Sequence, residues 1–161
     1  MTRPGRASAA LAAALAVPLG LAGCASAPAD GDIESVVEAQ VLTVPHVTGA
    51  FVGLASSGPS GRTLLVNIYV DSSDAATLAT VADASLAAIW GGVPIRPVTV
   101  SIALAPVPKP DPAYRLEGDA VDPGPIASAL AIDGSKVVRQ LLVVDAASMD
   151  ARYGVWHEPG K

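Results

Sequence analysis

A single cysteine, Cys24, stands at the end of an apolar run near the start of this 161-residue chain. A chain with one thiol cannot close an internal disulfide, so its folded part must be stabilised by a hydrophobic core. The composition allows this, because 51% of the residues are hydrophobic and only 16% are charged, which argues against a disordered chain. Aromatic residues make up only 4% of the total, so we expect a mainly aliphatic core.

The first 23 residues have the three-part layout of a secretory signal peptide. Arg3 and Arg6 supply a positive start, and an uncharged, mostly apolar run follows from Ala7 to Ala22. That run is shorter than the ~20 residues that a helix needs to cross a bilayer, so a membrane-spanning helix is the weaker interpretation. We expect residues 1–23 to be a signal peptide.

Residues 21–24 read Leu-Ala-Gly-Cys and resemble the lipobox of bacterial lipoproteins at every position. The resemblance implies that the Cys24 thiol carries a diacylglyceryl group and that the peptide is cut just before Cys24. Two acyl chains hold a protein stably on a membrane, whereas a single chain does so only marginally. The alternative is an ordinary secreted protein cut at the small residues 25–27, which the rigid ring of Pro28 beside that bond disfavours.

Removal of the signal peptide leaves 138 of the 161 residues, enough for one domain of ordinary size. Since two of the ten basic residues lie in the signal peptide, the mature chain carries 15 acidic and 8 basic side chains, a net charge of −7. This acidic balance argues against binding to nucleic acid and to anionic lipid. We expect a flexible tether over residues 24–31, one domain over residues 32–155 and a loose tail over residues 156–161.

Apolar residues at helical spacing predict two long helices. The first covers residues 32–42, and Asp30 or Asp32 is its expected cap. The second covers residues 74–90, and one of residues 71–73 is its expected cap. The apolar face of the second helix consists of Leu78, Val81, Ala82, Leu86 and Ile89.

Three strands are predicted over residues 47–55, 63–70 and 95–104, because apolar residues alternate along the second and third of them. The turn-forming segment Ser-Ser-Gly-Pro-Ser-Gly at 56–61 joins the first two in a hairpin. Six prolines fall in residues 105–125, which predicts a loop. The elements expected after this loop are a helix at 126–132, a strand at 138–145 and a last helical turn or two at 146–153.

This order, α-β-β-α-β followed by a Pro-rich loop and a short α-β-α, predicts the α+β class. Strands with one apolar face need only one covering layer, which two amphipathic helices supply. We therefore expect a two-layer sandwich of a mainly antiparallel sheet with helices on one face. The order is similar to that of small envelope domains such as the BON domain and to that of ferredoxin-like folds.

Two loop motifs resemble known ligand-binding loops. The sequence of residues 56–63 is similar to that of a phosphate-binding loop. Such a loop requires a helix after it, however, and a strand is predicted here. Residues 70–75 read Val-Asp-Ser-Ser-Asp-Ala and are similar to the metal-binding motif of von Willebrand A-type domains, except that Ala75 replaces its last serine. A hairpin turn and a helix cap explain both motifs, so we expect neither to bind a ligand.

His46 and His157 are the only histidines, and neither has a nucleophile, a carboxylate or further metal ligands at a recognisable spacing. Trp90 is expected to pack in the core, whereas for Trp156 packing and a ligand-stacking role both remain open. We expect no catalytic, cofactor-binding or metal-binding residues. Cys24, as the site of lipidation, is the one predicted functional residue.

Three hypotheses on function follow. The first is a non-enzymatic lipoprotein on the outer face of a bacterial membrane, which binds another envelope component or supports a membrane complex. The second is a small enzyme acting on an envelope substrate, which would need acid and base groups that converge in a pocket. The third is the solute-binding subunit of a transporter, for which 138 residues is short. The expected partners are the membrane, through the lipid on Cys24, and an envelope protein, with no cofactor and no nucleic acid.

Overall fold

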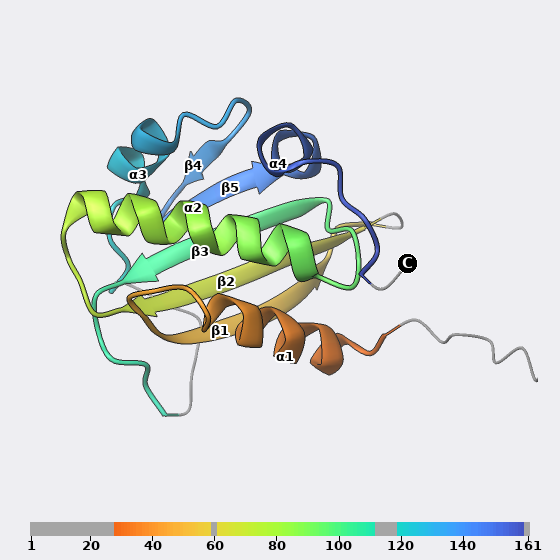
Figure 1. Cartoon of the computed structure of the whole chain (residues 1–161), viewed down its shortest axis with the longest axis horizontal. Helices are drawn as coiled ribbons and strands as arrows, with labels where there is room; N and C mark the ends of the chain where they lie inside the picture. The colour runs from red at the N-terminus through yellow and green to blue at the C-terminus, as the bar shows by residue number, and fades with distance from the viewer. Residues whose placement is uncertain (1–27, 59–60, 112–118, 160–161) are drawn as a thin grey trace, which may run out of the picture.

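The computed structural model describes residues 28–58, 61–111 and 119–159. These residues form four helices and one five-stranded mixed sheet (Figure 1). The predicted α+β class, with a mostly antiparallel sheet, is confirmed.

The sheet has the strand order β1-β2-β3-β5-β4. β2 and β3 run parallel, and every other neighbouring pair is antiparallel. A parallel pair needs a crossover connection, and helix α2 (Ala75–Gly92) provides it between β2 and β3. The strand bounds are β1 Val47–Ser56, β2 Arg62–Val70, β3 Thr99–Ala105, β4 Lys136–Val138 and β5 Leu141–Asp145.

The four helices contribute to one core together with one face of the sheet (Figure 1). Their bounds are α1 Asp30–Val41, α2 Ala75–Gly92, α3 Pro123–Leu130 and α4 Ala146–Tyr153. The core is mainly aliphatic, as the composition predicts. Its members include Ile33 and Val37 of α1, Leu86 and Ile89 of α2, Ile126 of α3 and Met149 of α4, above Val66, Ile102 and Val144 of the sheet.

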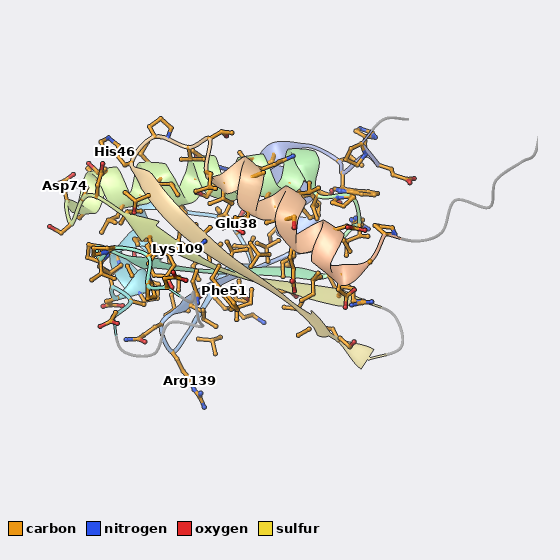
Figure 2. All side chains as sticks on the ribbon, turned by 90° about the horizontal axis from the view of Figure 1, so that it is seen from below. Glu38, His46, Phe51, Asp74, Lys109 and Arg139 are labelled. Atoms are coloured by element: carbon orange, nitrogen blue, oxygen red, sulfur yellow. The ribbon has the colours of Figure 1, made fainter. Side chains whose placement is uncertain are left out.

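The other face of the sheet is also partly covered, although we expected a covering layer on one face only. Tyr69 is fully buried there, and Val107 and Ala120 from the segment after β3 pack against the cluster around it. The same segment reaches the helix side, since Lys109 Nζ lies 2.6 Å from Glu38 Oε1 of α1. Figure 2 shows Lys109 between Glu38 and Phe51 of β1. The segment after β3 therefore packs across the edge strand β1 and is joined to α1 by this ion pair.

Gly49 of β1 provides the space for this contact. A Cβ at this position would lie 2.7 Å from the Cβ of Lys109, closer than two side chains pack. The absence of a side chain at Gly49 therefore lets the lysine cross the strand and reach α1.

The helix caps differ in part from the prediction. α1 begins after Ala29 without a side-chain cap, because Asp30 and Asp32 lie inside its first turn, where a carboxylate interacts favourably with the helix dipole. α2 is capped by Asp74, whose carboxylate accepts a hydrogen bond of 2.9 Å from the Thr77 amide, and not by residues 71–73. The predicted helix thus begins one residue later, at Ala75.

The last third of the chain shows the largest differences. The strand predicted over residues 138–145 is a hairpin of β4 and β5, in which Val138 faces Leu141. Its turn contains Arg139 at a left-handed φ of 56°, a conformation that residue type alone does not indicate. The continuous apolar sequence on both sides of the turn therefore concealed the reversal.

Two further boundaries move for identifiable reasons. β3 begins at Thr99, not at residue 95, because Pro94 and Pro97 have no amide proton to donate to a ladder. α3 begins at Pro123, not at residue 126, because the Asp122 carboxylate caps the Gly124 amide at 2.9 Å and proline is well suited to the first helical position.

One buried hydroxyl group offers a test of the core. Ser85 of α2 is fully buried, and its Oγ has no hydrogen-bond partner within the described residues. Burial of an unpaired hydroxyl is unfavourable, and alanine is the better helix former. We expect Ser85→Ala to raise the free energy of unfolding by about 1 kcal/mol, measured by urea denaturation. A loss of stability would show that the hydroxyl has a partner in solution.

Candidate functional site

Most of the candidate residues from the sequence analysis lie within the described part of the chain. Cys24 lies outside the described residues. Trp90 is 2% exposed, and its Nε1 donates to the Gly154 carbonyl at 2.8 Å, so the predicted packing role is confirmed. His157 is exposed.

Trp156 is held in place, although we expected a loose tail to begin there. Its amide donates to Asp150 Oδ1 at 2.8 Å, its indole donates to the Val93 carbonyl at 3.3 Å, and its side chain packs against the core. The reason is that α4 ends beside the end of α2, which brings the following residues onto the core. These contacts favour a packing role for Trp156 over a ligand-stacking role.

His46 has a carboxylate partner that its sequence spacing did not reveal. Its Nδ1 lies 2.9 Å from Asp71 Oδ1, and the Asp71 amide donates to the His46 carbonyl at 3.1 Å. The pair forms because β1 and β2 are antiparallel and Val47 faces Val70. The predicted hairpin contained this information, since it places the residue before β1 beside the residue after β2.

The His46–Asp71 pair lies at the end of the sheet where the parallel strands β2 and β3 finish. In open α/β sheets, ligands bind outside the carboxyl ends of parallel strands. α2 begins at the same end, and Figure 2 shows His46 and Asp74 close together there. His46 has a φ of 70°, a conformation that costs energy in a residue other than glycine and that is often found at functional sites.

Two hollows open beside this pair. The first, which we call the His46 hollow, has a volume of about 270 Å³. Its apolar lining comes from Val44, Pro45, Ala76, Val81 and Ala84, and its polar lining from His46, Thr77 and Thr80.

The second hollow lies on the other side of Asp71 and has a volume of about 350 Å³. Its lining includes Ser72 and Ser73 from the start of the β2–α2 loop and residues 106–108 from the segment after β3. Apolar walls with a few hydrogen-bonding groups are the usual make-up of a binding site.

The charge at this end is negative. Hydrogen bonds from the Thr77 amide and the Thr77 hydroxyl to the Asp74 carboxylate hold the pKa of Asp74 below its usual value. Asp74 is therefore ionised at neutral pH. No lysine or arginine lines either hollow within the described residues.

A second group of titratable side chains joins α4 to α2. The Tyr153 hydroxyl donates to Asp83 Oδ1 at 2.8 Å, and an Arg152 nitrogen donates to the same oxygen at 3.1 Å. Burial, together with the hydrogen bond that the hydroxyl donates to the Asp83 carboxylate, raises the pKa of Tyr153 well above its usual value. These contacts hold α4 against α2.

The loop at residues 56–63, whose sequence is similar to a phosphate-binding motif, is a hairpin turn, as predicted. β2 follows it and pairs with β1 from Arg62 onward, so the loop does not lead into a helix, as a phosphate-binding loop does. Arg62 Nη1 lies 2.7 Å from Asp30 Oδ2 at the start of α1. The described residues contain no group of three or more histidine, cysteine, aspartate or glutamate residues arranged to hold a metal ion. None of the helices described is long and apolar enough to span a membrane.

Comparison of the chain with models of protein families, with curated proteins and with solved structures finds no match. The similarity of element order to the BON domain and to ferredoxin-like folds therefore adds no information on the site.

Proposed function

We propose that this protein is a non-enzymatic binding module held on the outer face of a bacterial membrane by a diacylglyceryl group on Cys24. The observation that carries the proposal is the Leu-Ala-Gly-Cys sequence at residues 21–24, directly after an uncharged apolar run. The fold adds support, because the buried members of the main core among the described residues lie between Ile33 and Met149. Cleavage before Cys24 would leave this core intact.

The short connection to the lipid gives the domain an orientation. Six residues, from Cys24 to Ala29, precede α1, and even a fully extended segment of this length spans only about 20 Å. The end of the domain at which α1 begins therefore faces the membrane. His46 and the start of α2 lie at the opposite end (Figures 1 and 2), so the two hollows face away from the membrane, toward other envelope components.

The His46–Asp71 pair is the one observation that favours an enzyme instead. A carboxylate that orients an imidazole is a common arrangement for general base catalysis. In this protein, however, the two side chains are 54% and 56% exposed, whereas catalytic groups work best in sites that exclude water. The two rim hydroxyls donate to other groups, Thr77 to Asp74 and Thr80 to the Ala76 carbonyl. Binding is therefore the function that these contacts support better.

Replacement of the predicted lipidated residue tests the proposal. In bacterial cells that lipidate proteins, the wild type is expected in the membrane fraction, cut before Cys24 and labelled by radioactive palmitate. Cys24→Ser is expected to lose the label and either to leave the membrane fraction or to keep its full-length precursor, because serine offers no thiol for the lipid. Ser26→Ala, two residues away, is the matched control and should behave as the wild type. A Cys24→Ser protein that is processed and fractionates as the wild type does would contradict the proposal.

A further inference from the structure

We propose that the His46 hollow binds a small apolar side chain that has a cationic neighbour, as found on a basic and apolar segment of a partner protein. This inference rests on the proposed binding function and names the chemistry of the partner.

The size and floor of the hollow fit one side chain. Its volume of about 270 Å³ lies at the lower limit of pockets for small-molecule ligands, which run from about 300 Å³ upward. The floor is apolar and firmly packed, since Val44 is 7% and Val81 is 2% exposed. An apolar group of the size of leucine or valine can therefore enter without displacing a buried polar group.

The charge around the hollow determines which residue of the partner is favoured next to that apolar side chain. His46 on the rim contacts the carboxylate of Asp71, and Thr77 on the opposite rim contacts the carboxylate of Asp74. Both aspartates are exposed, and no lysine or arginine among the described residues lines the hollow. A cation beside the entering side chain is attracted by both carboxylates, which favours a basic partner.

The start of α2 does not reverse this preference. A helix N-terminus attracts anions through its free amide groups. In this protein the Asp74 carboxylate already accepts the hydrogen bond of the Thr77 amide, and so occupies that position. An anionic ligand would have to displace it while also facing Asp71.

A second copy of this chain is the less favoured occupant. Most described basic side chains already form ion pairs, as between Arg62 and Asp30 or between Lys109 and Glu38. The β4–β5 turn does present Val138, 49% exposed, next to Arg139, which has the required chemistry. The net charge of −7 on the mature chain nevertheless opposes self-association.

The test uses the mature chain, residues 24–161, as the Cys24→Ser variant, which keeps the whole core and needs no lipid. Three short probes are titrated into the isotope-labelled protein and followed by the amide signals of Thr77, Thr80 and Ala84. The first is acetyl-Lys-Leu-Lys-amide, the second has glycine in place of leucine, and the third has glutamates in place of the lysines. We expect saturable shifts of these signals with the first probe alone.

Substitutions in the protein locate the binding. Asp71→Asn should weaken the binding of acetyl-Lys-Leu-Lys-amide by about two- to fivefold, as for the loss of an exposed ion pair. Ala76→Leu, at an exposed position on the rim, should fill the hollow and abolish the saturable shifts. Asp32→Asn removes the same charge at the other end of the molecule and should have no effect.

Several results would overturn the inference. They are equal binding of the acidic or the glycine probe, shifts confined to other parts of the protein, and no saturable shift with any probe. Concentration-dependent self-association in analytical ultracentrifugation that Arg139→Glu abolishes would also overturn it, in favour of a second copy as the occupant. None of these results depends on the lipid, so failure here is distinct from failure of the proposed anchor.

Discussion

Leu86→Ala is expected to lower the free energy of unfolding by about 2–5 kcal/mol. Leu86 lies on the inner face of α2, is fully buried and belongs to the core that α2 shares with the other helices and the sheet. Its truncation removes the contacts of a whole side chain and leaves a cavity that close-packed neighbours fill only in part.

Urea denaturation followed by circular dichroism measures this effect. Leu42→Ala is the matched control, because Leu42 is 45% exposed at the end of α1 and should cost less than about 0.5 kcal/mol. If Leu86→Ala cost no more than this control, Leu86 would not lie in the core, and the face of α2 that meets the sheet would be assigned wrongly.

Trp90→Ala is expected to cost about 3–5 kcal/mol. The indole is 2% exposed near the end of α2, and its Nε1 donates to the Gly154 carbonyl, just after α4. The substitution therefore removes both a large apolar contact and a link between two helices. Trp156, the remaining tryptophan, then reports unfolding by its fluorescence.

Trp90→Phe separates the two contributions. Phenylalanine keeps most of the apolar contact but leaves the Gly154 carbonyl without its donor, at a cost of about 1–3 kcal/mol. We expect the phenylalanine variant to be clearly more stable than the alanine variant. Equal losses would show that the hydrogen bond, and not the packing, accounts for the role of Trp90.

The central part of the fold could be predicted from the sequence because the apolar residues that form its helix and strand patterns all face one core. The helix predicted over residues 74–90 is found as α2, Ala75–Gly92, since its apolar stripe has the helical period and lies against the sheet. The strand predicted over residues 63–70 is found as β2, Arg62–Val70, since its alternating residues meet that same core.

The parts that escaped prediction depend on local geometry without a sequence signature. The β4–β5 turn uses Arg139 in a left-handed conformation, and no glycine or asparagine marks it. The cover on the second face of the sheet comes from Val107 and Ala120, within a segment whose prolines predict a loop but not where that loop packs.

The candidate site was predictable only in part. The contact between His46 and Asp71 follows from the β1–β2 hairpin, which the sequence does predict. The His46 hollow does not follow, because it is lined jointly by Val44 and Pro45, after α1, and by Ala84 and its neighbours on α2. Helix and strand periodicity say nothing about such a contact between a loop and a helix.

Mass spectrometry of the N-terminus of the mature protein, purified from bacterial membranes, is the direct test of lipidation at Cys24. We expect the first residue to be Cys24, with a diacylglyceryl group on its sulfur, and residues 1–23 to be absent. A mature protein that lacks Cys24 and begins with an unmodified residue such as Pro28 would contradict it and would identify an ordinary secreted protein.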